Sequence, residues 1–105
     1  MAIKKQFSSL EDLIKYSSQP VFVCFYANWC STSQSYAPVL EQLKTQMGNQ
    51  IQVVKINTDK YPELAAKHEI KALPTSLLFL QGELACRIKG VMQTPQLIPY
   101  LQKFL

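Results

Sequence analysis

Residues 21–33, VFVCFYANWCSTS, decide the fold prediction because a strand pattern passes directly into a helix pattern within them. Residues 20–27 form a continuous run of β-branched and aromatic side chains, which is typical of a central strand covered on both faces. Residues 32–48 follow with helical periodicity, and Pro38 interrupts that helix because proline removes a backbone hydrogen bond. Cys30 therefore lies where a strand gives way to a helix.

The rest of the chain alternates in the same way. A strand is predicted over about residues 3–7, and a helix runs from a Ser8 cap to about residue 17, with Glu11 completing a capping box. Strands are predicted over 51–56, 75–80 and 84–89, and a short helix over 61–68 begins near Pro62. The turn Gln81-Gly82-Glu83 joins the last two strands as a hairpin.

The final helix is predicted from a Thr94 cap with Pro95 at its first position. Its apolar stripe comprises Leu97, Ile98, Leu101, Phe104 and Leu105. The complete order, βαβαβα followed by ββα, predicts an α/β protein with a parallel part and a late antiparallel hairpin.

Composition narrows the function classes. The 105 residues suit a single domain, 1–105, and the chain is 48% hydrophobic and 17% charged, as in packed globular proteins. The net charge of +4 comes from scattered basic residues, so we expect no nucleic-acid partner. The first six residues contain no apolar stretch typical of a signal peptide, and the longest apolar runs are far shorter than the roughly 18 residues of a membrane span, so no membrane partner is expected. The three cysteines do not have the spacing of a disulfide framework, which favours a reducing, cytoplasmic location.

Neither a metal nor a cofactor is expected. The chain has one histidine, His68, and no cluster of cysteine and histidine with the spacing of metal ligands. We expect His68 to lie on a solvated helix face.

Several separated landmarks resemble the thioredoxin family over about residues 3–105. They are the strand into Ala27-Asn28-Trp29-Cys30, the Ala37-Pro38 kink, the third strand and the loop after it over Val53–Asp59, the loop Ala72-Leu73-Pro74-Thr75, and Gly82 and Gly90. The resemblance implies the thioredoxin fold, a central mixed five-stranded sheet flanked by four helices. The opening residues and the stretch 52–62 look most like cyanobacterial and plastid-type thioredoxins.

The departures from the family pattern cluster at the active site. Ser31-Thr32 replaces Gly-Pro, Ser33 replaces the second cysteine, and Gln34 replaces a basic residue. Cys24 stands where the family has a buried acid. Several linked changes favour a diverged member over a single engineered Cys→Ser trap.

Cys30 and Ser33 are the candidate catalytic residues. The thiolate is the nucleophile of cysteine chemistry, and unpaired N–H groups at a helix N-terminus favour that anion. Ser33, one turn later, can donate a further hydrogen bond to the sulfur. The open alternatives are an inert remnant for Cys30 and a simple helix-start serine for Ser33.

Cys24, Lys55 and Pro38 are predicted to be structural residues near the site. A buried thiol costs less than a buried carboxylate, so we interpret Cys24 as a core residue, with a disulfide to Cys30 as the alternative. Lys55 matches the family's partner of the buried acid, and without that acid its ammonium should turn toward water. Cys86 has no motif around it and is interpreted as structural.

The resemblance also places a peptide-binding surface at Trp29, Leu73, Pro74 and Thr75. Pro74 is expected to be cis, and the family's loop there offers backbone groups to an extended peptide. Trp29 either lines this surface or packs in the core.

These residues predict a monothiol thiol–disulfide exchange protein of cell redox homeostasis. Cys30 would attack a protein disulfide or a glutathionylated protein, and glutathione or another external thiol would resolve the mixed disulfide. Such an enzyme would isomerise disulfides or deglutathionylate proteins and be weak as a dithiol reductase. The alternative is a redox-inactive binding or chaperone-like module that keeps the peptide-facing surface. An iron–sulfur glutaredoxin is disfavoured because the loop reads Leu-Pro-Thr.

Overall fold

The computed structural model of the protein describes residues 9–105, so the strand predicted over residues 3–7 lies outside it. The described elements are α1 (Leu10–Tyr16), β1 (Val21–Tyr26), α2 (Ser31–Ser35), α3 (Ala37–Met47), the 3-10 turn η1 (Gly48–Gln50), β2 (Gln52–Asn57), α4 (Pro62–Lys67), β3 (Thr75–Leu80), β4 (Glu83–Lys89) and α5 (Thr94–Gln102).

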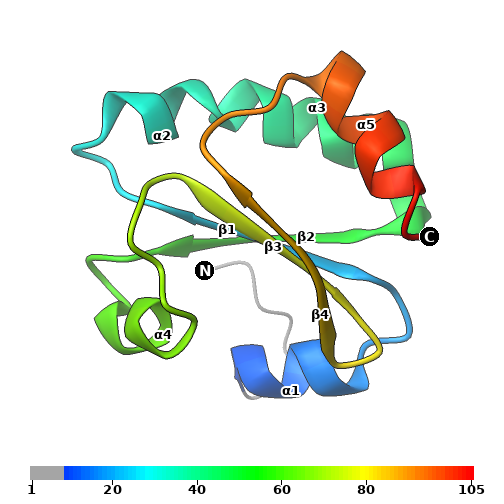
Figure 1. The fold of residues 1–105 in the computed structure, drawn as a ribbon, viewed down its shortest axis with the longest axis horizontal. Coiled ribbons are helices and arrows are strands. Elements are labelled where there is room, and N and C mark those ends of the chain that lie inside the picture. Colours follow the sequence, from blue (N-terminus) through cyan, green and yellow to red (C-terminus); the bar gives the residue numbers. More distant parts are fainter. Residues whose placement is uncertain (1–8) are drawn as a thin grey trace.

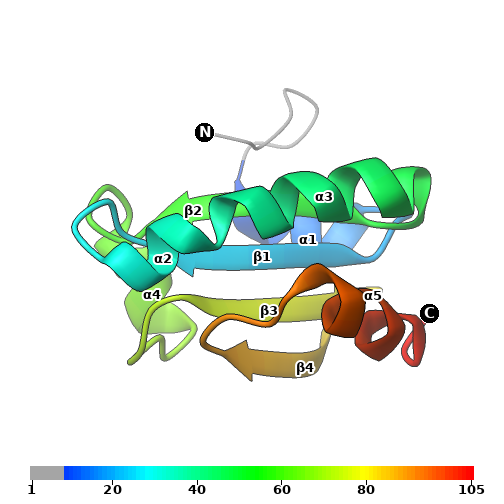
Figure 2. The same ribbon diagram turned by 90° about the horizontal axis from the view of Figure 1, so that it is seen from above.

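The described strands form one mixed sheet in the order β2-β1-β3-β4. β1 pairs with β2 in parallel, and β1–β3 and β3–β4 are antiparallel. Helices α2, α3 and α5 cover one face of the sheet, while α1 and α4 cover the other (Figures 1 and 2). The α/β class is confirmed, and so are the four helices when α2 and α3 are counted as one interrupted helix. The described sheet has four strands, whereas five were predicted, and the remaining predicted strand is the one that lies outside the described residues.

Side chains of β1 alternate between two cores. Phe22 and Cys24 belong to the core under α3 and α5, whereas Val21, Val23 and Phe25 belong to the core against α1 and α4. This alternation follows from the two-residue repeat of a strand and explains why the whole run is apolar. It also directs the Cys24 side chain toward the helices that follow Cys30.

The predicted break in the long helix is present. α2 ends at Ser35, Tyr36 caps both helices, and Pro38 lies in the first turn of α3. The Tyr36 amide donates to the Ser33 carbonyl at 3.1 Å, and its carbonyl accepts from the Leu40 amide at 3.1 Å. Proline fits there because the first turn of a helix leaves its amides without intrahelical partners.

Three expectations about helix ends were wrong. Ser9, and not Ser8, caps α1, since its hydroxyl accepts a hydrogen bond from the Asp12 amide at 3.2 Å. Gln93, and not Thr94, is the cap of α5, and the Thr94 hydroxyl instead donates a hydrogen bond to the side-chain oxygen of Gln42 on α3. Leu105 follows α5 and is 48% exposed, so it is not part of the buried stripe. Two adjacent polar residues satisfy a capping pattern equally well, and only packing selects one.

The hairpin between β3 and β4 turns through Gln81 and Gly82, whose φ angles are 51° and 86°. Positive φ at both central residues matches the right-handed twist of the paired strands. Within residues 9–105, no helix is both long and apolar enough to cross a membrane.

Candidate active site

Cys30 caps α2 at the edge of the sheet where β1 ends. Its amide donates to the Ala27 carbonyl at 3.2 Å, and its carbonyl accepts from the Gln34 amide at 3.0 Å. The sulfur lies against the Ser33 amide, which is the largest cause of a lowered Cys30 pKa, and the Ser33 hydroxyl adds to it. Thr32 contributes less, and partial desolvation opposes the shift. The geometry therefore favours the thiolate at Cys30.

Gln34 closes the turn that carries Cys30. Its side-chain amide donates a hydrogen bond to the carbonyl of Asn28, across the segment that contains Trp29 and Cys30. The sequence marked Gln34 only as a departure from a family pattern. No local signal shows that its amide reaches back to this turn.

The loop before β3 faces Cys30. The Leu73–Pro74 peptide bond is cis, as predicted. The Cys30 sulfur lies 3.9 Å from the Leu73 carbonyl oxygen. Thr75 is buried and its hydroxyl donates to the Ala72 carbonyl at 2.7 Å, so it holds the loop and does not point out of it. The structure thus brings Cys30 and Leu73 together from segments 43 residues apart.

A pocket of about 290 Å³, here called the peptide groove, lies beside Cys30. It is lined by Trp29, Cys30, Thr58, Ala65, Ile70, Lys71 and Leu73. Trp29 is 71% exposed, so the core-packing alternative for this residue is wrong. Four of the lining residues were missed by the sequence analysis, because they come from α4 and two loops and share no motif.

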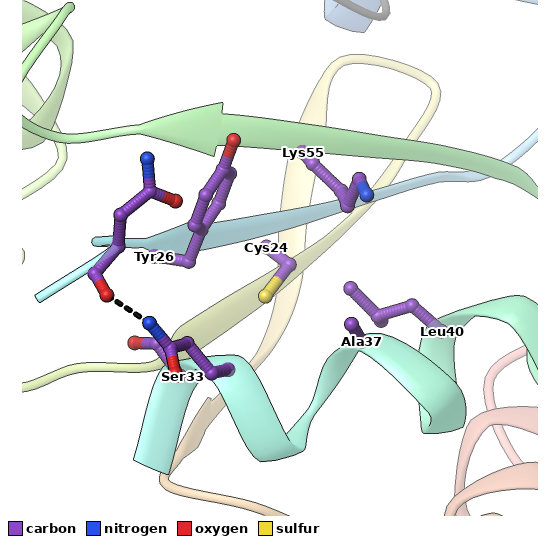
Figure 3. A pocket seen from close by; sticks show the side chains of 8 residues that line it. Cys24, Tyr26, Ser33, Ala37, Leu40 and Lys55 are labelled. Atoms are coloured by element: carbon purple, nitrogen blue, oxygen red, sulfur yellow. Dashed lines mark hydrogen bonds between the residues drawn. The ribbon is translucent and has the colours of Figure 1, made fainter. Parts of the chain in front are cut away.

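A second pocket, the Cys24 pocket, opens between the sheet and the α2–α3 helix with a volume of about 350 Å³ (Figure 3). Its lining residues are Cys24, Tyr26, Asn28, Ser33, Gln34, Ala37, Leu40 and Lys55. Cys24 has no exposed surface, and burial raises its pKa to about 11. The core interpretation of Cys24 is therefore confirmed.

Lys55 and Ser76 flank Cys24 on the neighbouring strands. Lys55 pairs with it across β1–β2 and Ser76 across β1–β3, and both partly offset the effect of burial on the Cys24 pKa. Lys55, whose ammonium was expected to turn to water, is half-buried and lines the Cys24 pocket. Its charge is therefore still felt at the position where the family has an acid.

Two buried hydroxyl groups, those of Tyr36 and Ser76, also belong to the surroundings of Cys24. Tyr36 is fully buried, and desolvation raises its pKa to about 12. Its hydroxyl approaches Ser76, although neither group has a hydrogen bond of ordinary geometry within residues 9–105. Ser76 appeared in the sequence only as part of a strand. The register with Cys24 is what places its hydroxyl under the site.

The remaining cysteine lies apart from Cys30. Cys86 is half-buried on β4, and burial raises its pKa. β3 separates that strand from β1, and all three cysteines are free thiols. Among residues 9–105, no group of three or more histidine, cysteine, aspartate or glutamate side chains could hold a metal ion.

The expectation of a solvated His68 was wrong. Its side chain is 14% exposed and lies within 6 Å, ring centre to ring centre, of Phe25 at 5.7 Å and Phe79 at 5.8 Å. Desolvation lowers its pKa, against the opposing effect of Glu11, whose carboxylate oxygen is 3.8 Å from Nε2. The helical pattern of 61–68 ends at residue 68 itself, so it gives no sign that this side chain turns inward.

A mixed sheet with a helix-start cysteine facing a cis-proline loop defines the class of thioredoxin-fold proteins. The sequence model of the thioredoxin family matches residues 2–103, so the chain belongs to the thioredoxin family. It is a thioredoxin-like thiol–disulfide exchange protein, similar to "Thioredoxin-like protein slr0233" of the cyanobacterium Synechocystis, with 50% identity over the full length of both chains.

Plastid proteins are also similar. "Thioredoxin Y1, chloroplastic" of Arabidopsis thaliana is 43% identical over 99% of this chain and 60% of its own length. This chain spans about three fifths of the length of the thioredoxin Y relatives. Among solved structures, one from a study of thiol resolution in a yeast mitochondrial 1-Cys peroxiredoxin via glutathione/thioredoxin systems superimposes with a TM-score of 0.81. It is 28% identical and covers all of this chain and 92% of that one.

Proposed function

We propose that this thioredoxin-family protein works by a monothiol mechanism, in which Cys30 is its one exchanging thiol and an external thiol resolves the mixed disulfide. One observation carries the proposal: the residue whose amide and hydroxyl lie against the Cys30 sulfur is Ser33, a serine. A serine can stabilise the thiolate, but it cannot expel a bound target by forming a disulfide.

The other thiols offer no ready replacement for a resolving cysteine. Cys24 is fully buried with a pKa raised to about 11, and Cys86 lies on β4, with β3 between it and β1. Attack on a mixed disulfide needs a thiolate that can reach it. Resolution by a thiol from outside the chain is therefore the simpler route.

The exchange has two balanced steps. The Cys30 thiolate attacks one sulfur of a target disulfide, forms a mixed disulfide with it and releases the other sulfur as a thiolate. With a glutathionylated protein, the released thiolate is the protein's cysteine, and glutathione stays on Cys30. A second glutathione thiolate then attacks, producing oxidised glutathione and restoring the Cys30 thiolate.

A second candidate function is binding without redox turnover. The observation that favours it is the exposed Trp29 beside the peptide groove, a surface that would hold an extended peptide without any chemistry. In that case, the chain would bind the same unfolded or extended segments whether or not Cys30 is present.

Turnover of a glutathionylated peptide, with glutathione, glutathione reductase and NADPH, tests the first proposal against the second. The wild-type chain and a Cys86→Ser control should turn over at similar rates, and Cys30→Ser should be inactive. Equal background rates for wild type and Cys30→Ser would contradict the exchange mechanism and favour the binding module. Loss of turnover in Cys86→Ser would instead identify Cys86 as a resolving thiol.

A further inference from the structure

Next to the peptide groove lies a pocket of about 260 Å³ that carries an excess of positive charge. It is here called the basic pocket, and it is lined by Glu69, Lys71, Ala72, Thr75, Arg87 and Lys89. Three of these side chains are cations and one is a carboxylate. Within residues 9–105, the ion pairs shorter than 4.0 Å join Glu11 to Lys67 and His68, so none of the three cations has a carboxylate at that distance.

The fold holds the Arg87 guanidinium in place and fixes the backbone position of Lys89. Arg87 donates to the carbonyl of His68 at 3.0 Å and to that of Glu69 at 3.5 Å, which fixes its guanidinium against the end of α4. Lys89 pairs with Thr75 in the β3–β4 register. The adjacent Gly90 amide donates to the Pro74 carbonyl at 2.7 Å and ties this end of β4 to the cis-proline loop.

Lys71 joins the basic pocket to the site of exchange. It is exposed and lines both the basic pocket and the peptide groove that contains Cys30. A peptide lying along the cis-proline loop with its cysteine at Cys30 would therefore pass Lys71 and reach Lys89 and Arg87. Cations that have no carboxylate partner attract carboxylates, and this attraction is screened by salt.

We propose that the preferred targets carry acidic side chains beside the cysteine that reacts with Cys30, and that the basic pocket receives those carboxylates. The inference rests on the proposed exchange at Cys30 and names the class of target for it. Lys89 and Arg87 lie in the basic pocket but outside the peptide groove, and Arg87 already donates to two backbone carbonyls, so Lys89 is the specificity residue of this surface.

The test uses two short peptides with one cysteine each, flanked on both sides by aspartates in one and by asparagines in the other. Each cysteine is activated as a disulfide with thionitrobenzoate. Attack by the Cys30 thiolate on the peptide sulfur forms the Cys30–peptide disulfide and releases coloured thionitrobenzoate, a good leaving group because its thiol is acidic. Matching peptides with serine in place of cysteine are measured by fluorescence anisotropy, which needs no redox step.

The aspartate peptide should react and bind at least about threefold better than the asparagine peptide at low salt, with the ratio falling as salt rises. Lys89→Gln should bring the ratio toward one, and Glu69→Gln should raise it. Lys44→Gln removes the same charge on α3, beside Gln52 at the start of β2, and should leave the ratio unchanged.

A ratio near one in the wild-type chain would overturn the inference. An equal fall in Lys44→Gln and Lys89→Gln would also overturn it, because net charge would then explain the preference. If neither cysteine peptide reacts while the aspartate serine peptide still binds better, the exchange proposal fails and the acidic docking surface stands.

Discussion

Cys24 and Cys30 are six residues apart on one continuous segment, yet their surroundings are opposite. Cys30 caps a helix at the sheet edge, where the Ser33 amide and hydroxyl lower its pKa. Cys24 lies in the middle of β1 under α3, where burial raises its pKa to about 11. The comparison teaches that the position of a thiol relative to strand end and helix start decides its reactivity.

The comparison also explains what Ser33 contributes. Ser33 lines the Cys24 pocket and at the same time contacts the Cys30 sulfur, so it separates the reactive thiol from the buried one. Its amide and hydroxyl lower the Cys30 pKa, although the hydroxyl has no hydrogen bond of ordinary geometry within residues 9–105, and a serine offers no second sulfur.

Alkylation rates should differ most between the two thiols. At pH 7 a thiol of pKa about 11 has a thiolate fraction roughly 300-fold below that of an ordinary cysteine, and burial slows the reagent further. Timed labelling with mass mapping should therefore modify Cys30 first, Cys86 next and Cys24 last by more than a hundredfold. Labelling in denaturant, where all three rates should converge, is the control. If Cys86 reacts before Cys30, the site is misassigned.

Cys24→Asp should lower the free energy of unfolding by about 3 kcal/mol at pH 8, because it buries a carboxylate in the core. Burial raises the folded-state pKa of such an acid, so the folded state binds the proton more tightly than the unfolded chain. The loss should therefore grow with rising pH and be smaller at pH 5.

Denaturant melts of Cys24→Asn provide the matched control, since this amide has nearly the same shape and does not titrate. The difference between the aspartate and asparagine variants isolates the charge. A Cys24→Asp variant as stable as the parent at pH 8 would mean that Lys55 and the open Cys24 pocket fully compensate the carboxylate.

Ser33→Cys should restore part of the insulin reduction driven by a thioredoxin reductase, a few-fold above the wild-type chain. The gain should be incomplete because the buried acid of the family is absent at Cys24.

Ser33→Ala isolates the effect of the hydroxyl. The Cys30 pKa should rise in this variant, which a pH profile of Cys30 alkylation will show. No change in that profile would leave the backbone amides as the sole cause of the lowered pKa.

The smallest effect is expected at His68, on the other face of the sheet, where burial again shifts the pKa of a titratable side chain. Its pKa is lowered mainly by desolvation, with Lys67 and Arg87 acting in the same direction and Glu11 opposing them. The unfolded chain therefore binds the proton more readily, and stability should fall as pH drops below about 6.5. Thermal melts of His68→Gln should lose this slope between pH 7 and 5, and an unchanged slope would assign it to other groups.

Some features could be predicted because they depend on neighbouring residues. The apolar run of β1, the proline break before α3 and the hairpin at Gln81-Gly82 each follow from local pattern and backbone geometry. Cys30 as the candidate nucleophile belongs to the same group, since a strand-to-helix junction is visible in the sequence. The cap at Ser9 shows the limit, because a shift of one residue leaves the pattern intact.

The sequence by itself determined an α/β order of elements, the strand-to-helix position of Cys30 and the presence of Ser33 three residues later, because these depend on periodicity and residue type. Only the tertiary structure decided what Cys30 faces and what surrounds it. The Leu73 carbonyl, the inward His68, the Ser76 hydroxyl beside Cys24 and the shared place of Lys71 in two pockets all come from strand register and loop packing. Such contacts join segments far apart in the chain, where no local pattern links one residue to the other.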